Sequence, residues 1–594
     1  MLRQIVLRDA AAAQWLRFTD PLEILVARRV AEVPGVIAEA ERRVAADGLY
    51  AAGFVTYEAS PAFDDALTAY PAGVLPPACF GVFAPPTVTE RLEDTDTAAA
   101  HADWHMPVGR GEYGRAIAAI KEQIALGNTY QVNFTVRQHA GGIRDPWRLF
   151  AGIAEDAPYA AYLDCGDHVI VSASPELFFD LDGDRLTCKP MKGTAARGLT
   201  LEADHALRDA LRSSEKNRAE NVMIADMLRN DMGRVAVPGT VLPAALFEIE
   251  KYPTVWQMTS TVTASTHASV SDIFAALFPC ASVTGAPKVA SMKLIAALED
   301  SPREIYTGAI GCMAPARKAR FSVAIRTAWI DRRSGHGVYG TGGGIVWDSE
   351  AQAEFAECLD KARVLSSGTR GRDFSLLESL LWTRDEGWFL RDEHLRRMED
   401  SAAYFDFPFD RAAAAGDLDR LAGELPARPC KVRMRLGRDG AVTLSQGPLP
   451  VAPGATLRLA LARQPVDASD PFLYHKTTER SVFEQARRGA GDCDDVLLWN
   501  REREITESTI ANVVVRRRGR LLTPPVDCGL LPGTFRARLL AEGRIEEARI
   551  PLEDLAAAEE IFLVNSVRGW MPCRLLRDHG SALFVTGGRS TAAR

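Results

Sequence analysis

A hairpin and the short stretch after it constrain the fold more than any other part of this sequence. Residues 177–181 and 185–188 alternate apolar and polar side chains on either side of an Asp-Gly pair, which is a strong hairpin pattern. Pro190 cannot donate to a sheet ladder, so the second strand is predicted to end there. Lys192 is then predicted on a turn beside Gly193. A lysine in that position is either a nucleophile or an ordinary surface charge, and spacing alone leaves both readings open.

The chain is too long for one hydrophobic core. It has 594 residues, of which 47% are hydrophobic and 25% charged, and single cores rarely grow beyond roughly 250–300 residues. A short polar break near residue 370 offers a boundary. The predicted organisation is an N-terminal part (1–108), a catalytic part (109–366), a linker (367–372) and a second domain (373–594).

Charge and hydropathy exclude several classes of function. The net charge is −8 without a long basic run, so nucleic acid is not expected as a partner. No apolar run approaches the ~18–20 residues that span a bilayer, and the charged N-terminus lacks a signal-peptide core. The ten cysteines include no Cys-x-x-Cys pair, which favours a reducing compartment. We expect a cytoplasmic protein without membrane contact.

Periodicity predicts several elements around candidate functional residues. Residues 24–46, 113–125 and 215–234 are expected to be helices. Residues 129–134 are expected to be a strand with Gln131 and Asn133 on one face. Strict alternation over 321–326 predicts a strand that turns Arg326 away from the apolar face.

A further helix is predicted over 350–365. Phe355, Leu359 and Ala362 would form its buried stripe, while Glu354, Glu357 and Lys361 share another face. From the residues alone, the last three are either a functional cluster or a surface Glu–Lys pair worth ~0.2–0.5 kcal/mol.

The stretch Pro190-Met191-Lys192-Gly193-Thr194 resembles the signature of chorismate-utilising enzymes. The lysine at this position is similar to the aminodeoxychorismate synthase component I branch of the family, since anthranilate synthases usually carry alanine at the same position. Residues 219–231, 282–288 and 306–311 match further motifs of this family in the expected order.

The resemblance implies roles for residues of the first domain. Lys192 corresponds to the nucleophile and Glu176, 16 positions earlier, to the general acid. Magnesium would be held by Glu220 and Glu357, with Glu354 as a further ligand. Asn217 departs from the family, in which relatives often carry an acid. The substrate-binding positions would be Gln131, Asn133, Thr194, Thr284, Tyr306, Gly308, Arg326, Gly342, Gly343 and Lys361.

A second resemblance covers the C-terminal part. Residues 474–480 are similar to aminodeoxychorismate lyase, a fold-type IV pyridoxal-phosphate enzyme, around its cofactor-binding Lys476. Glu507 would partner the pyridine nitrogen. Ser379 falls where the lyase carries a catalytic threonine, and the opening lacks the family's Gly-Asp-Gly. The remaining cofactor-binding positions would be Arg397, Gly533, Thr534 and Ser566.

These resemblances imply an α+β chain of two domains. The first is expected to be a sandwich of antiparallel sheets with helices, and the second a fold-type IV domain resembling D-amino acid aminotransferase. Together they would convert chorismate and ammonia to 4-amino-4-deoxychorismate and then to 4-aminobenzoate and pyruvate. Magnesium and pyridoxal 5'-phosphate are the expected cofactors.

Partners and alternatives follow from the same resemblance. None of the ten cysteines lies in a Gly-x-Cys-x-Gly elbow, so a separate glutamine amidotransferase subunit is expected. A homodimer through the second domain is an arrangement that fold-type IV allows. Two other readings stay open: another chorismate-branch enzyme, of the anthranilate type, fused to an aminotransferase, or a first domain that only docks or regulates.

Overall fold

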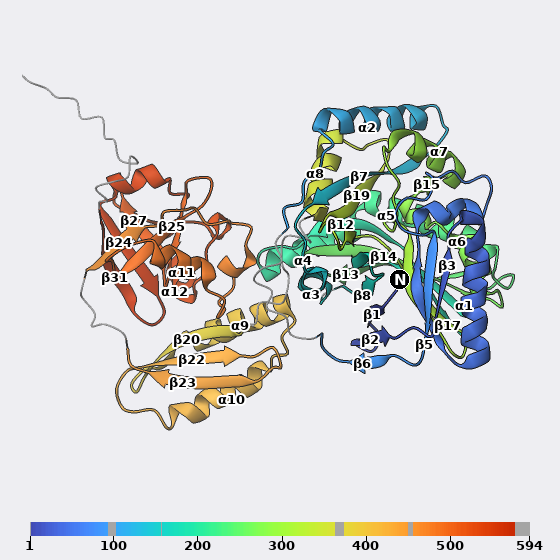
Figure 1. Ribbon diagram of the computed structural model, residues 1–594. Coiled ribbons are helices and arrows are strands. Elements are labelled where there is room, and N and C mark those ends of the chain that lie inside the picture. The colour runs from blue at the N-terminus through green and yellow to red at the C-terminus, as the bar shows by residue number, and fades with distance from the viewer. Residues whose placement is uncertain are drawn as a thin grey trace, which may run out of the picture. The chain divides into compact units, whose positions relative to one another are not determined.

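The computed structural model describes residues 2–92, 102–155, 157–252, 254–362, 374–449 and 456–576 (Figure 1). The chain divides into two compact units, one made of Met1–Arg197 with Leu207–Gly371 and the other of Gly198–Ala206 with Arg372–Arg594. The predicted linker, 367–372, lies outside the described residues. In the described part of the chain, no helix combines the length and apolar character needed to cross a bilayer.

The first unit is built on two sheets. The nine-stranded sheet has the order β15-β7-β19-β18-β9-β8-β1-β2-β6, with bounds β1 Gln4–Asp9, β2 Gln14–Thr19, β6 Thr87–Thr89, β7 Gln131–Ala140, β8 Tyr159–Asp164, β9 His168–Ser174, β15 Gly285–Ala286, β18 Thr327–Asp331 and β19 Gly337–Ile345. The ten-stranded sheet follows the path β12-β14-β11-β10-β17-β16-β4-β5-β3, with β13 paired to β14. Its bounds are β3 Glu23–Ala27, β4 Tyr50–Val55, β5 Ala78–Phe83, β10 Leu177–Asp182, β11 Arg185–Lys189, β12 Met191–Ala196, β13 Leu242–Lys251, β14 Val255–Ser265, β16 Ala309–Ala314 and β17 Lys318–Val323.

Neighbouring strands in both sheets pair antiparallel, and the two sheets share an apolar core. Ile5 and Phe18 of the first sheet pack with Phe54 and Phe83 of the second. Burying such faces against each other supplies most of the stability of a sandwich. The sandwich of antiparallel sheets predicted from the sequence is therefore confirmed for this unit.

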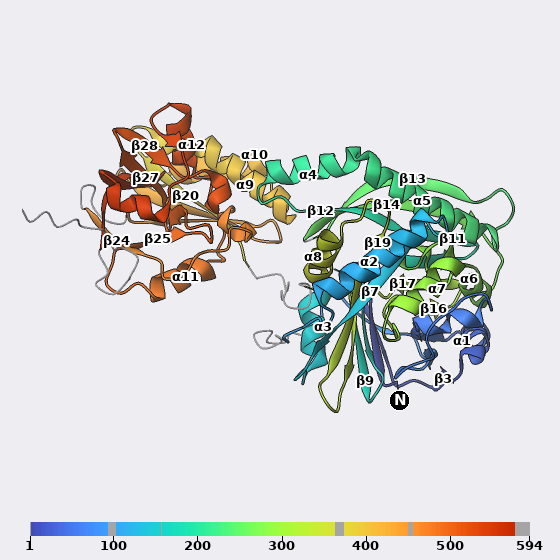
Figure 2. The same ribbon diagram turned by 90° about the horizontal axis from the view of Figure 1, so that it is seen from above.

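Helices cover the sandwich (Figure 2). Against the second sheet pack α1 (Val33–Asp47) and α5 (Glu215–Gly233), with α6 (Val270–Leu277) beside them. Against the first sheet pack α3 (Pro146–Ala154), α7 (Lys288–Leu298) and α8 (Ala351–Ala362), and α2 (Arg110–Ala125) packs on α8. The remaining helix is α4 (Leu201–Ser213).

Two elements differ from the sequence predictions. Residues 24–46 are not one helix, because β3 takes Glu23–Ala27 and α1 begins only at Val33. Ile24, Leu25 and Val26 are good strand formers, and they find a partner in β5. Lys192 is not on a turn but in β12, which pairs with β14. Pro190 interrupts the ladder for one residue, and the register shifts between Met191 and Thr194, around Gly193.

Two side chains also lie differently from the prediction. Arg326 follows β17 rather than continuing it, and its φ of 51° places it in the left-handed region. Leu359 is 42% exposed, and Cys358 joins Phe355 and Ala362 on the buried face of α8. The prediction of the buried stripe was therefore wrong at one position, because Cys358 and not Leu359 faces the core.

The second unit has a small and a large sheet. The four-stranded sheet has the order β21-β20-β22-β23, with β20 Leu376–Thr383, β21 Gly387–Phe389, β22 Cys430–Leu436 and β23 Val442–Gly447. Helices α9 (Arg391–Phe405) and α10 (Arg411–Ala422) share its apolar core. The eight-stranded sheet comprises β24 Leu457–Leu461, β25 Asp495–Trp499, β26 Ile505–Ser508, β27 Asn512–Arg517, β28 Arg520–Thr523, β29 Glu546–Glu547, β30 Glu560–Asn565 and β31 Gly569–Leu575, accompanied by α11 (Ser481–Arg488) and α12 (Thr534–Ala541).

Two candidate active sites

The first candidate site is centred on the Lys192 amine. Lys192 reaches over the end of β19, where Gly344 pairs with Asn133 of β7. A Cβ at position 344 would fall 2.6 Å from the Lys192 Nζ and 2.5 Å from Nε2 of Gln131. Only glycine therefore leaves room for both side chains. Asn221 of α5 donates to the Lys192 carbonyl at 3.2 Å and so fixes β12 against the helix.

The surroundings of Lys192 favour a neutral amine. Burial lowers its pKa, and the charge of Lys361 lowers it further. The carboxylates of Glu220, Glu176 and Glu357 act in the opposite direction without cancelling the effect of burial. A lysine must lose its proton to attack an electrophile, so a depressed pKa suits a nucleophile.

Glu176 lies between β9 and β10 with only 3% of its surface exposed. Its Oε1 accepts a hydrogen bond of 2.7 Å from the hydroxyl of Ser282. Burial raises its pKa to about 7, although Ser282 and the charge of Lys192 both favour the ionised form. A carboxyl group with this pKa is still partly protonated at neutral pH and can act as an acid.

Further carboxylates gather near Lys192. Glu357 pairs with Nζ of Lys361 at 2.7 Å, and Lys361 also donates to the Gly342 carbonyl at 2.7 Å. Glu354 accepts from the Ser349 hydroxyl at 2.7 Å, and burial raises its pKa. Its Oε2 would lie 3.0 Å from a Cβ at Gly343. The glycines of β19 thus form the floor between Lys192 and α8.

These carboxylates have the oxygen ligands that magnesium prefers, and magnesium usually takes only one or two from the protein. Glu220 and Glu357 both act on the Lys192 amine, so both face the same site. Among the described residues, however, no group of three or more His, Cys, Asp or Glu side chains is arranged to hold a metal ion. The assignment of Glu220, Glu357 and Glu354 to a magnesium ion therefore stays a prediction.

The other predicted substrate-binding residues of β7 and its neighbours are mostly buried. The side-chain amide of Gln131 has neither Nε2 nor Oε1 hydrogen-bonded within the described structure, so both atoms are available to a ligand. Asn133 and Thr284 are joined by a backbone hydrogen bond of 2.7 Å. Thr194 lies on β12 and donates to Oε1 of Gln257 at 2.9 Å.

Tyr306, Gly308 and Arg326 belong to the loops at the ends of β16 and β17. Tyr306 is buried, and its ring lies against Gly340, where a Cβ would come within 2.2 Å of it. Gly308 is equally constrained, with the Val55 carbonyl 2.3 Å from a Cβ. Their predicted roles in carboxylate binding stay predictions.

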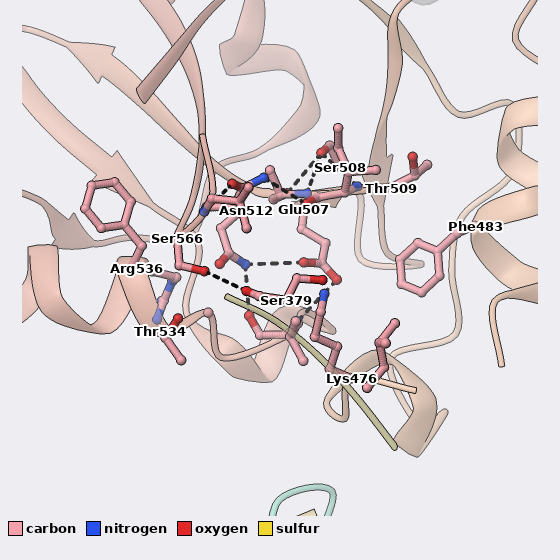
Figure 3. Close-up of a pocket in the computed structure, with 18 of the residues that line it drawn as sticks. Ser379, Lys476, Phe483, Glu507, Ser508, Thr509, Asn512, Thr534, Arg536 and Ser566 are labelled. Atoms are coloured by element: carbon pink, nitrogen blue, oxygen red, sulfur yellow. Dashed lines mark hydrogen bonds between the residues drawn. The ribbon is translucent and has the colours of Figure 1, made fainter. Parts of the chain in front are cut away.

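The second candidate site is a cavity of about 250 Å³ in the second unit. Figure 3 shows the Lys476 amine and the Glu507 carboxyl group pointing toward one another inside it. Ser379 of β20 and Ser566 also line the cavity, and the Ser566 hydroxyl donates to the Ser379 carbonyl at 3.4 Å. These predicted residues, distant in sequence, are therefore brought together.

Burial controls the protonation of both groups. It lowers the pKa of Lys476 to about 8, with the charge of Arg397 acting in the same direction. It raises the pKa of Glu507 to about 8, against hydrogen bonds and nearby cations. Glu507 accepts from the Leu531 backbone at 3.2 Å and from the Asn512 side chain at 3.3 Å.

The opposite wall combines features that suit a phosphate. Helix α12 begins at Thr534 after Gly533, and the first N–H groups of a helix bind anions. A Cβ at Gly533 would fall 2.0 Å from Oδ1 of Asn512. Arg397 donates to the Pro532 carbonyl at 3.1 Å, beneath the same loop. A buried amine, a buried carboxyl group and a helix N-terminus around one cavity fit pyridoxal phosphate.

Several residues with structural importance were missed by sequence reasoning. Ser282 and Asn221 lie inside motifs noted above, but their partners, Glu176 and Lys192, are remote in sequence. Glu378 was also missed: it receives two hydrogen bonds from Arg397, at 2.8 and 2.7 Å, and lies 2.6 Å from Nδ1 of His394. The available signal was a glutamate on the face of β20 that otherwise carries apolar residues.

Comparison with known proteins assigns both units to described families. Residues 16–367 match the model of the chorismate binding enzymes, and residues 375–576 match the class IV aminotransferases. The chain is 40% identical over 264 residues to aminodeoxychorismate synthase component 1 of Salmonella typhimurium, which covers 43% of this chain and 57% of that protein. It is 37% identical over 281 residues to the Bacillus subtilis protein of that name, covering 47% and 59% respectively.

Among solved structures, anthranilate synthase component I from Streptococcus pneumoniae TIGR4 aligns with a TM-score of 0.51 and 22% identity, covering 61% of this chain and 92% of that one. This likeness concerns the fold of the first unit. The match spans little more than half the length of the Salmonella and Bacillus proteins, 57% and 59%.

Proposed function

Since the chain belongs to the chorismate binding enzyme family and carries a class IV aminotransferase domain, we propose that it makes 4-aminobenzoate from chorismate in two steps. The first unit would replace the C4 hydroxyl of chorismate by an amino group. The second would remove pyruvate from the product and leave the aromatic ring. The pairing of Lys192 and Glu176, a lysine of depressed pKa and a carboxyl group of raised pKa in one site, carries this proposal.

In the first step, the neutral amine of Lys192 bonds to C2 of chorismate and the two conjugated ring double bonds shift. The C4–O bond breaks as Glu176 gives its proton to the departing hydroxyl, which leaves as water. Ammonia then bonds to C4, both double bonds shift back, and the C2–N bond breaks with its electron pair going back to Nζ. Magnesium held by Glu220 and Glu357 would neutralise a substrate carboxylate.

In the second step, pyridoxal phosphate held by Lys476, Glu507, Arg397 and the start of α12 would supply an electron sink. The Glu507 carboxylate would hold the pyridine nitrogen in its protonated form. Lys476, with its pKa near 8, takes the proton from C4 of the substrate. The C3–O bond then breaks as the ring becomes aromatic, and the departing enolpyruvate takes up a proton to become pyruvate, a departure that the Ser379 hydroxyl would assist.

Ammonia would come from a separate glutamine amidotransferase. The names of the Salmonella and Bacillus proteins, component 1 of a synthase, support a second component, and no cysteine of this chain lies in a glutaminase elbow. The proposal is tested by incubating the purified chain with chorismate, ammonium, magnesium and pyridoxal phosphate. Formation of 4-aminobenzoate and pyruvate in equal amounts is expected, whereas anthranilate as the product would reject it.

A further inference from the structure

The cavity of the second unit has a strongly basic wall whose charges the proposed chemistry does not use. It consists of Lys431 and Arg433 on β22, Arg480 before α11, and Arg568 between β30 and β31, all of which line the cavity. We call these four residues the basic wall.

The geometry of the small sheet explains how this wall arises. Ser379 of β20 lies directly opposite Arg433 of β22 in the antiparallel register, so both side chains leave the same face of the sheet. Lys431 precedes Arg433 by two residues and shares that face. The intervening Val432 points to the other face, where it packs with Leu395 of α9. Two cations therefore stand beside the predicted catalytic serine.

The four charges lie close enough to influence one another. Burial lowers the pKa of Lys431, and the charges of Arg433, Arg568 and Arg480 lower it further. In the described part of the chain, Lys431, Arg433 and Arg568 take part in no ion pair. Arg480 donates to the Thr509 carbonyl and lies over Phe483, 4.7 Å from its ring centroid.

The carboxylates that line the cavity are Glu507 and Glu479. Burial raises the pKa of Glu507 to about 8 against the charges of Lys476 and Arg480, so this group is mostly uncharged at neutral pH. Glu479 accepts from the backbone of Ser481 at 3.1 Å, at the start of α11. Arg397 is paired with Glu378. Gathering like charges in a partly buried cavity is unfavourable unless an anion joins them.

We propose that the basic wall binds two carboxylates of the substrate and makes the second unit selective for amines that carry a dicarboxylate. Four cations from three chain segments exceed what the single carboxylate of a simple amino acid can engage, because one carboxylate takes one bidentate guanidinium. An amine on a ring with a carboxylate and an enolpyruvyl carboxylate provides both anions. This inference rests on the proposed function, since the first unit would supply such a product.

Binding is measured first, on the full chain loaded with pyridoxal phosphate. The probe is 3-(carboxymethoxy)benzoate, a ring with two carboxylates and no amine, and benzoate is its single-charge counterpart. Changes in the visible absorbance of the bound cofactor report only the second cavity. Wild type is expected to bind the dicarboxylate more tightly than benzoate, and Arg433→Gln and Arg568→Gln should each weaken its binding about ten-fold or more.

A matched control lies on the same strand. Arg435 shares the face of Arg433 and donates to Ser375 at 3.3 Å, so Arg435→Gln should leave probe binding within about two-fold. If the basic wall served the phosphate of the cofactor instead, Arg433→Gln would weaken cofactor binding and leave the probe preference intact. That result, or an unchanged probe affinity in both variants, would overturn the inference.

Turnover separates this inference from the proposed function. With 4-amino-4-deoxychorismate, Arg433→Gln should raise KM about ten-fold while kcat changes by less than about three-fold, and added salt should raise KM in wild type more than in the variant. Wild type that releases no pyruvate would refute the proposed function, and the probe titration would still decide the role of the basic wall.

Discussion

The hydroxyl of Ser282 donates a hydrogen bond of 2.7 Å to Oε1 of Glu176 in the first candidate site. Glu176 is buried, and burial raises its pKa to about 7 despite this bond. The serine therefore sets how far the pKa of the proposed acid can rise. It also holds one oxygen of the Glu176 carboxyl group in place.

Removing that hydroxyl should shift the pH dependence of the first step. The bond favours the ionised carboxylate, so Ser282→Ala should raise the pKa of Glu176 and move the basic limb of the pH–rate profile upward by about one pH unit. The measurement is kcat for chorismate amination at constant free ammonia. Ser282→Thr keeps a hydroxyl and should restore the original limb. A profile that does not move in Ser282→Ala would show that Glu176 is not the titrating acid.

A methyl group at Gly344 should block the first step without unfolding the chain. The Cβ of Gly344→Ala would come within 2.6 Å of Nζ of Lys192, the flexible end of a long side chain. The amine can move aside at little cost in stability, but misplacing a reacting atom by about 1 Å can reduce kcat about a hundred-fold. Amination should fall accordingly, while release of pyruvate from added aminodeoxychorismate stays normal.

Gly114 provides the control for that variant. It lies in α2 of the same unit, and a Cβ there would meet nothing within 4 Å. Gly114→Ala should therefore aminate chorismate at the wild-type rate. Full amination activity in Gly344→Ala would mean that the Lys192 amine works from another position.

The buried Glu378 should stabilise the second unit in a pH-dependent way. Burial alone would raise its pKa, but the charges of Arg397 and His394 outweigh burial and hold the pKa well below its usual value of 4.5. The stabilisation is therefore complete above about pH 4.5 and is lost as the pH falls toward the folded-state pKa.

Glu378→Gln should lower the free energy of unfolding at pH 7 by about 3 kcal/mol, because it leaves the Arg397 guanidinium without a counter-charge. The difference from wild type should shrink below pH 4.5, as measured by chemical denaturation. Cofactor affinity should also fall, since Arg397 loses its anchor. Glu386→Gln, an exposed change in the β20–β21 turn, should have no effect. A pH-independent difference would contradict the ion-pair explanation.

The sequence predicted the fold class correctly, and it proposed residues for both sites, but it did not predict how those residues are held. Alternation and an Asp-Gly pair sufficed for the hairpin of β10 and β11, since a hairpin is a local structure. The sequence predicts a turn at Lys192 because a proline usually ends a strand. In the structure, β14 pairs with β12 as well as with β11, so the sheet continues beyond Pro190. The sequence predicts a buried Leu359, because no neighbouring residue indicates that Cys358 faces the core in its place. Ser282 and Glu378 find their partners only through the tertiary fold.

The source of nitrogen gives a further prediction. The pure chain should aminate chorismate with ammonium salts and not with glutamine. The rate should increase with pH from about 6 to 7 because a larger fraction of the ammonium becomes neutral ammonia, the form that can attack C4. Adding an active glutamine amidotransferase component should make glutamine effective. Rapid glutamine-dependent turnover by the chain alone would disprove the need for a partner.

The central claim, that two sites act in sequence, is tested most directly by mixing two inactive variants. Lys192→Ala should lack amination and Lys476→Ala should accumulate aminodeoxychorismate, so neither should make 4-aminobenzoate from chorismate and ammonium. Mixed in one vessel, they should make it after a lag, because the intermediate passes through solution between the two proteins. The account predicts equal amounts of 4-aminobenzoate and pyruvate by mass spectrometry. Production of 4-aminobenzoate by Lys192→Ala alone at the wild-type rate would contradict it.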